Sequence, residues 1–274
     1  VVSNTSGHIG SFLGSSGTAT VTGAGSQWNN TGNLFVGDEG TGTLNIQDGG
    51  VVSNEEGEIG GASGGVGGVT VTGTGSQWNN ADFLYVGRGG GDGTLNIESG
   101  GIVSNTTGII GAGSSGTVTV TGSGSQWNNA SDLGVGFSNL GVLNIEAGGV
   151  VNNAFGVVGG ATTLLPGNAN GTVNISGAGS QWNNADGLNV GQDSKGTVNQ
   201  TGGNVSVQSG NLTLAVFPAG VDIFGAPYDA SEGTYNLQGG TLDLNNGDLL
   251  AGDGTATFNF TGGTLKNPGT IDPG

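Results

Sequence analysis

A segment of 19 residues occurs in four similar copies, and this repetition restricts the chain to a narrow set of folds. The copies are Ala19–Gly37, Val69–Gly87, Val118–Gly136 and Val173–Gly191, and each contains the letters GSQWNN. Their tryptophans, Trp28, Trp78, Trp127 and Trp182, lie 50, 49 and 55 residues apart. Periods of this size are typical of solenoids and propellers, so the repeat takes precedence over local propensity.

A second segment lies between these copies, at Gly42–Gly60, Gly93–Gly111 and Gly141–Gly159. It keeps the same order of apolar, glycine and asparagine positions as the first segment. The structural unit is therefore about half the spacing between tryptophans. The common column of asparagines is Asn4, Asn30, Asn54, Asn80, Asn105, Asn129, Asn153 and Asn184. The first seven follow one another at 24 to 26 residues, and the last comes after 31 because of an insertion around residues 161–170.

Each unit contains three short runs in which apolar residues alternate with polar ones. In one unit these are Val69 with Val71, then Trp78, then Leu84 with Val86, and glycine-rich corners separate them. Alternation with a period of two indicates strands, and no sustained helical periodicity is found. Three strands in about 25 residues, repeated without a break, predict one coil of a parallel β-solenoid.

The predicted fold is therefore all-β: a single parallel β-helix of about eleven three-strand coils of about 25 residues. Residues 1–274 form one continuous solenoid, with regular repeats over 1–191 and divergent coils over 192–274 that contain an inserted loop at 216–232. Equivalent residues are expected to stack at about 4.8 Å. Three inner columns begin at Ala19, Val21 and Val36 and recur once in every coil.

Composition limits the possible partners. The chain has 64 glycines among 274 residues and 33% hydrophobic residues, which argues against a thick globular core. The chain has 20 acidic residues and only three basic ones, so nucleic acid and anionic membranes are poor partners. No apolar run is long enough for a spanning helix, so no membrane insertion is expected. Cysteine is absent, which excludes disulfides and thiolate metal sites.

The tryptophans and asparagines each allow a functional and a structural interpretation. The tryptophans could be sugar-stacking platforms, but intervening coils carry Val52, Val103 and Val151 at the same position, which favours core packing. The asparagines at 4 and 105 begin glycosylation sequons. The whole column is better explained as an amide ladder, in which each side chain bonds to the next one and to the turn backbone.

Catalytic and metal sites are disfavoured. His8 is the only histidine and is expected to be an exposed turn residue. Acidic turn residues at 38, 39, 55, 56 and 58 could hold calcium, but the calcium-roll nonapeptide is not met. Arg88 and Lys195 should lie about four coils, or roughly 19 Å, apart, too far to act on one bond. We therefore expect a protein that is not an enzyme and has no cofactor, with catalysis on polysaccharides as the least favoured alternative.

The repeat resembles a known family. GTLNIxxGGxVSNxxGxIG followed by GTVTVTGxGSQWNNxxxLxVG is similar to the repeat of autotransporter (type V secretion) passengers and PEP-CTERM-associated surface proteins. The resemblance covers Val1 to about Gly191 closely and the rest loosely. It implies a right-handed β-helix that is exported to the bacterial cell surface or outside the cell, and it implies no catalytic residues.

Two functions follow as hypotheses. The first is an extracellular structural protein, a bacterial surface rod or filament, whose partners are copies of itself end to end or side by side. Candidate self-association residues lie in two apolar loops: Leu164, Leu165, Phe217, Ile223, Phe224 and Tyr228. The second is a monomeric adhesin fragment, part of an autotransporter passenger, that binds host or glycan ligands, with surface glycans as candidate partners.

Overall fold

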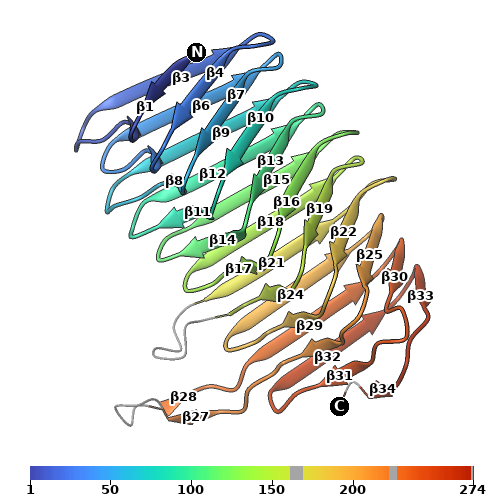
Figure 1. Ribbon diagram of the computed structural model, residues 1–274. Helices are drawn as coiled ribbons and strands as arrows, with labels where there is room; N and C mark the ends of the chain where they lie inside the picture. Colours follow the sequence, from blue (N-terminus) through green and yellow to red (C-terminus); the bar gives the residue numbers. More distant parts are fainter. Residues whose placement is uncertain (161–168, 222–226, 273) are drawn as a thin grey trace.

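The computed structural model describes residues 1–160, 169–221, 227–272 and 274. The described residues form three long parallel sheets and one short hairpin, with no helix among them. Consecutive strands enter the three sheets in turn, so each sheet grows by one strand per coil (Figure 1). The predicted all-β parallel solenoid is confirmed.

The strands of each sheet occur once per coil. Sheet A contains β1 (Val2–Asn4), β4 (Gln27–Asn30), β7 (Val51–Asn54), β10 (Gln77–Asn80), β13 (Ile102–Asn105), β16 (Gln126–Asn129), β19 (Val150–Asn153), β22 (Gln181–Asn184), β25 (Asn204–Val207), β30 (Thr241–Asp243) and β33 (Thr264–Lys266). Sheet B contains β2 (Gly7–Ile9), β5 (Leu34–Val36), β8 (Gly57–Ile59), β11 (Phe83–Arg88), β14 (Thr107–Ala112), β17 (Leu133–Val135), β20 (Gly156–Val158), β23 (Leu188–Val190), β26 (Leu212–Leu214), β31 (Leu249–Ala251) and β34 (Ile271–Asp272). Sheet C contains β3 (Ser16–Thr22), β6 (Thr41–Gln47), β9 (Val66–Thr72), β12 (Asp92–Glu98), β15 (Gly116–Thr121), β18 (Leu140–Glu146), β21 (Asn170–Ile175), β24 (Lys195–Gln200), β29 (Glu232–Leu237) and β32 (Thr255–Phe260).

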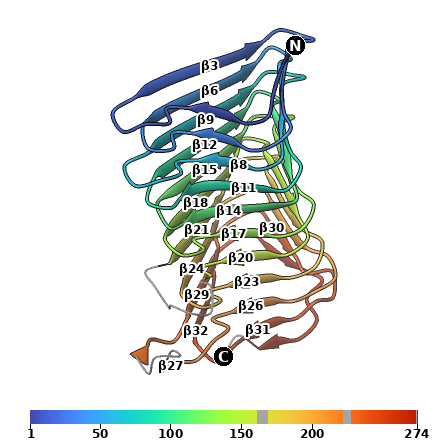
Figure 2. The same ribbon diagram turned by 60° about the vertical axis from the view of Figure 1, so that its left-hand side comes forward.

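The coils are not equivalent at the two ends. In the described residues, ten coils hold a strand of every sheet, whereas the N-terminal coil holds only β1 and β2. Sheet C therefore starts one coil later than sheets A and B. At the other end β32, β33 and β34 complete the last coil. Figure 2 shows the coils stacked one upon another along the length of the molecule.

The core is one continuous cluster because apolar residues alternate with polar ones along each strand. In β6 the inward Leu44 and Ile46 are fully buried, and their register partners in β9 are Val69 and Val71. The cluster extends from Ile9 in the N-terminal region to Leu249 near the other end. Every coil shares its apolar surface with its neighbours, so the stack, rather than the single coil, is the stable unit.

Glycine is required at some corners by the backbone itself. Gly60 follows β8 with φ of +72°, and a Cβ there would collide with the main-chain oxygen of Asp92 in the next coil. Only glycine combines a left-handed conformation with so close an approach. This dual requirement explains much of the glycine content without invoking disorder.

One hairpin interrupts the stack between β26 and β29. Strands β27 (Gly220–Val221) and β28 (Pro227–Tyr228) pair antiparallel and extend away from the coils in both ribbon views (Figures 1 and 2). They lie within the inserted loop at 216–232. Sheet C continues past the insertion, since β24 pairs directly with β29.

Candidate functional site

A buried polar network joins each tryptophan to asparagines of two coils. Trp78 is fully buried, and its indole N–H donates to Asn54 Oδ1 in the preceding coil over 2.6 Å. Asn54 Nδ2 in turn donates to Asn80 Oδ1, also over 2.6 Å. Asn80 Nδ2 donates to the main-chain oxygen of Ser104 in the following coil over 3.4 Å. A pair of coils is therefore the hydrogen-bonded unit, which explains the alternation of the two sequence segments.

The other three copies repeat this arrangement. The indole N–H groups of Trp28, Trp127 and Trp182 donate equivalent hydrogen bonds to Asn4, Asn105 and Asn153. Hydrogen bonds between side-chain amides join Asn4 to Asn30, Asn105 to Asn129 and Asn153 to Asn184. All four rings point inward, so they do not form sugar-stacking platforms. The asparagine column differs from the expected ladder, because hydrogen bonds between two asparagine side chains occur only at every second step from one coil to the next. At the other steps the amide reaches a main-chain oxygen, as Asn80 does.

The asparagine sequon at position 105 is not an accessible glycosylation acceptor. Asn105 is 5% exposed, and its Nδ2 is bonded to Asn129 Oδ1 over 2.6 Å. Attachment of a glycan to this nitrogen would require the coil to open. Its role in the folded protein is to hold the ring of Trp127, since buried polar atoms are stabilising only when they are paired.

A glycine in the preceding coil makes room for each indole. Gly57 in β8 pairs with Leu84 in β11, and a Cβ at Gly57 would lie 2.8 Å from Cζ2 of Trp78 and would collide with Asn80 Oδ1. Its φ is not positive, so close packing rather than backbone conformation requires glycine here. Sequence reasoning missed this role. The available signal was the regular alternation of glycine and leucine down one inner column.

A buried serine in the GSQWNN segment was also missed. Ser76 is fully buried; its hydroxyl donates to the main-chain oxygen of Thr72 over 2.7 Å and accepts the N–H of Gly49 in the preceding coil over 3.0 Å. Ser125 and Ser180 make the equivalent pairs of bonds. The serine thus closes the turn before each tryptophan strand and ties it to the neighbouring coil.

A different polar pair replaces the tryptophan network after residue 191. The hydroxyl of Tyr235 donates to Gln200 Oε1 over 2.7 Å, and Gln200 Nε2 donates to the main-chain oxygen of Thr241 over 2.8 Å. Both side chains are fully buried, and burial raises the pKa of the Tyr235 hydroxyl well above its ordinary value. Tyr235 therefore stays protonated as a hydrogen-bond donor and is unsuited to proton transfer at neutral pH.

The three basic residues connect neighbouring coils. Arg88 binds Glu58 at 2.9 Å and lies 4.1 Å from the ring centre of Tyr85. Burial raises the pKa of the Glu58 carboxyl, and the charge of Arg88 opposes this rise. Lys195 pairs with Glu232 at 3.2 Å and Lys266 with Asp243 at 2.8 Å. Each cation is thus neutralised on its own part of the rod.

Replacement of Asp243 by Asn should give a small, pH-dependent loss of stability. Partial burial alone would raise the pKa of Asp243, but hydrogen bonds from Lys266, from the Asn245 N–H and from Asn267 hold it below its ordinary value. The stabilisation is therefore present at neutral pH and is lost as the pH falls through the folded-state pKa. In urea titrations we expect a loss of about 1 kcal/mol or less at neutral pH, and a smaller loss at an acidic pH below the ordinary pKa of an aspartate. An equal loss at both pH values would contradict this assignment.

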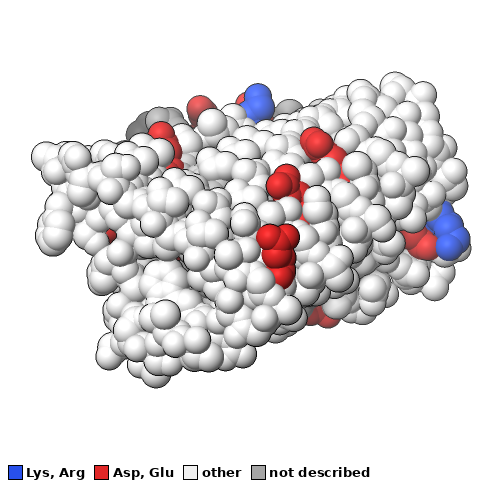
Figure 3. Space-filling model, turned by 90° about the horizontal axis from the view of Figure 1, so that it is seen from above, with Lys and Arg blue, Asp and Glu red and all other residues white. Residues whose placement is uncertain are grey.

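The acidic turn residues do not assemble a metal site. Among the residues that the structure describes, no group of three or more His, Cys, Asp and Glu side chains is arranged to hold a metal ion. Figure 3 shows acidic side chains scattered singly over a largely uncharged surface. His8 is exposed and its ring stacks on Phe35 at 4.8 Å between centroids. Within the described ranges, no helix has the length and apolar character of a membrane span.

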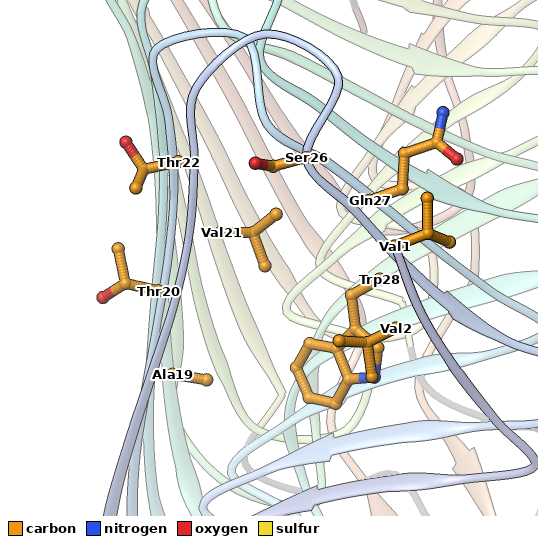
Figure 4. Close-up of a pocket in the computed structure, with 9 residues that line it drawn as sticks. All are labelled: Val1, Val2, Ala19, Thr20, Val21, Thr22, Ser26, Gln27 and Trp28. Carbon is orange, nitrogen blue, oxygen red and sulfur yellow. The ribbon is translucent and has the colours of Figure 1, made fainter.

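The N-terminal coil carries a groove of about 510 Å³. Figure 4 shows Ala19 and Val21 pointing toward Val2 and Trp28, whereas Thr20 points away. Val2 comes from β1, the other inward residues from β3 and β4. The groove is the apolar interior of the solenoid where it opens at this end.

Comparisons with known proteins give one structural likeness. No family model matches the chain, and no curated protein matches it. A solved structure, the TibC-catalysed, hyper-glycosylated fragment 55–350 of TibA, is similar to it with a TM-score of 0.36 and 17% sequence identity. The match covers 98% of this chain and 99% of that one.

Of the six candidate self-association residues, the structure describes Phe217 and Tyr228. Phe217 is 42% exposed, and its main chain is held to the hydroxyl of Ser231 at the base of the inserted segment. Tyr228 belongs to β28. Leu164, Leu165, Ile223 and Phe224 lie outside the described residues. A role in self-association remains a prediction.

Proposed function

We propose that this protein is a non-enzymatic structural protein of the bacterial cell surface that acts as a stiff rod. The observation that carries the proposal is the continuity of the core from Ile9 to Leu249. In the described residues, sheets A and B accompany this core through all eleven coils and sheet C through ten of them. At about 4.8 Å per coil, the rod is roughly 50 Å long.

The use of its charged residues supports a passive role. Catalysis by general acid and base needs groups that converge on one bond and have free protons or lone pairs. Arg88, Lys195 and Lys266 are each engaged with a carboxylate from an adjacent coil, and these pairs lie far apart along the rod. These ion pairs connect adjacent coils and therefore suit a structural role. Location outside the cell is supported by the resemblance of the repeat to exported passenger and surface proteins.

Self-association of rods is the most direct extension of this function. Val2 at one end is 61% exposed, and Ile271 and Phe260 at the other are 51% and 53% exposed. These residues stand in columns that are buried elsewhere in the stack. Exposed apolar side chains on strands that have an unpaired edge favour addition of another chain.

Electron microscopy of the purified polypeptide, with light scattering at several concentrations, tests the rod. We expect unbranched rods of roughly 50 Å that lengthen in multiples of this value as concentration rises. Phe217→Ser should leave end-to-end growth intact, because Phe217 lies on the side of the stack. Compact particles, or measurable turnover of neutral or acidic polysaccharides, would contradict the proposed function.

A monomeric adhesin is the second candidate, and the outer face of sheet B favours it. There the rings of Phe83 and Tyr85 stack at 5.5 Å between centroids, and His8 stacks on Phe35. Aromatic rings on a surface are suitable for packing against the apolar faces of sugars. Monodisperse rods that bind a neutral glycan, with binding lost in Phe83→Ala, would favour the adhesin over the filament.

A further inference from the structure

Sheet C presents the broadest outer face of the rod. Its strands are six or seven residues long, whereas the strands of sheet A have three or four residues. From β3 to β32 each strand pairs residue for residue with the next, and Figure 2 shows these strands following one another down the stack. Sheets that stay regular over many strands are typically stabilised by ladders of side chains.

Two columns of outward side chains run along the middle of this face, and we call them the central columns. Their neighbours on the same strands, such as Val173 and Ile175, are fully buried, so the central columns face outward. None of their residues is charged, although the whole chain has a formal net charge of −17. The first column is Thr18, Thr43, Gly68, Thr94, Thr117, Val142, Thr172, Thr197, Thr234 and Thr257, and the second is Thr20, Asn45, Thr70, Asn96, Thr119, Asn144, Asn174, Asn199, Asn236 and Asn259.

Asparagines of five successive strands form a continuous ladder in the second column. Asn174 Nδ2 donates to Asn144 Oδ1 over 2.9 Å, and Asn199 Nδ2 donates to Asn174 Oδ1 over 3.0 Å. The ladder continues through Asn236 and Asn259, with 2.8 Å at each step. Each amide inside the ladder already has one donor and one acceptor satisfied within the chain. Removing water from this face therefore costs less than it would for isolated asparagines, because unpaired polar groups are what make burial unfavourable.

The charged residues of the sheet C strands lie on either side of the central columns. Asp92, Lys195 and Glu232 begin their strands, whereas Glu98 and Glu146 end theirs. Lys195 is paired with Glu232. Two acidic rods repel each other where their carboxylates meet, so the uncharged central columns are where a second copy can approach.

We propose that two copies of this chain pair face to face through the central columns of sheet C. Ladders of identical side chains, asparagine among them, form dry and interdigitated contacts between paired sheets. A two-fold axis relates the two copies, so the same face serves both partners. The pairing rests on the proposed rod function, since each copy must present a straight and regular face.

The area of the face is sufficient for a stable pair. The ten strands of sheet C span about 48 Å, and two columns of alternate residues span about 13 Å. A contact of this size covers about 600 Å² of each copy, or about 1,200 Å² in total, and contact over the whole length of the strands approaches about 1,900 Å². Specific protein interfaces bury about 1,200 to 2,000 Å².

Small-angle X-ray scattering and sedimentation of the whole 274-residue chain, over a range of concentrations, test the pairing. We expect the mass to double and the cross-section to widen, while the length of the particle stays at roughly 50 Å. End-to-end growth gives a different result, a longer particle of unchanged cross-section. Single rods would contradict the pairing alone, whereas compact particles would contradict the proposed rod.

Matched arginine substitutions locate the contact. Thr197→Arg places a charge in the central columns, and Thr213→Arg places the same charge on the outer face of sheet B, where Thr213 is also half-buried. The first should weaken pairing about tenfold or more, because the charge is buried without a partner, and the second should leave pairing unchanged. Thr172→Arg repeats the test in the adjacent strand if circular dichroism shows that Thr197→Arg does not fold.

Three outcomes would overturn the proposal. The first is equal pairing by the folded Thr197→Arg and Thr213→Arg variants. The second is single rods at every concentration up to about 1 mM. The third is single rods that bind a neutral glycan and lose this binding in Thr197→Arg, which would assign the face to that ligand instead of a second copy.

Discussion

Replacement of Trp127 by alanine should lower the free energy of unfolding by about 3 to 5 kcal/mol. The ring is fully buried between Val103 and Val151 of the adjacent coils, so its loss leaves a cavity that rigid strands cannot close. The substitution also removes the indole N–H that donates to Asn105 Oδ1 over 2.7 Å. An unpaired buried amide oxygen adds its own penalty to that of the cavity.

Two further substitutions separate these causes. Trp127→Phe keeps most of the ring but loses the N–H, and should cost about 1 to 3 kcal/mol. Trp28→Ala removes the same residue type in a half-buried setting at the open end, where water replaces the ring, and should cost less than Trp127→Ala. Urea unfolding followed by circular dichroism measures all three. If Trp127→Phe were as stable as the unchanged chain, the indole bond would contribute nothing.

The fold could be predicted from the sequence because every coil repeats the same two signals. Alternation in segments such as Val69 to Val71 identified strands, and the spacing of asparagines identified the coil. The inward direction of Trp78 followed from its sharing a column with Val52, and the structure pairs these two residues directly. Such inferences need only periodicity, which a single sequence contains.

The contacts between coils could not be predicted in the same way. Whether Asn54 bonds to another amide or to main chain depends on side-chain directions at about 4.8 Å spacing, which periodicity does not determine. The hydroxyl of Ser76 and the missing side chain of Gly57 act on residues of neighbouring coils, 21 to 27 positions away in the sequence. Their roles depend on the volumes of partners that only the register identifies.

Gly108→Ala should be strongly destabilising, although it adds only one methyl group. Gly108 pairs with Leu133 of the next coil, and its φ is not positive, so backbone conformation does not forbid alanine. A Cβ would lie 2.6 Å from Cζ2 of Trp127 and would collide with Asn129 Oδ1. This oxygen accepts the hydrogen bond from the side-chain amide of Asn105. Because the sheets on both sides fix the coil spacing, we expect overpacking to cost about 2 to 3 kcal/mol.

Gly68 provides the matched control for this prediction. It lies in β9 with φ that is also not positive, and its nearest neighbour to an added Cβ is the main-chain oxygen of Gly42 at 4.0 Å. Its register partners in the adjacent coils are Thr43 and Thr94, so a side chain fits at this outward position. Gly68→Ala should be neutral or stabilising by about 0.4 to 1 kcal/mol, because alanine restricts the unfolded chain. Similar urea midpoints for the two variants would show that the column of inner glycines does not set the spacing around the tryptophans.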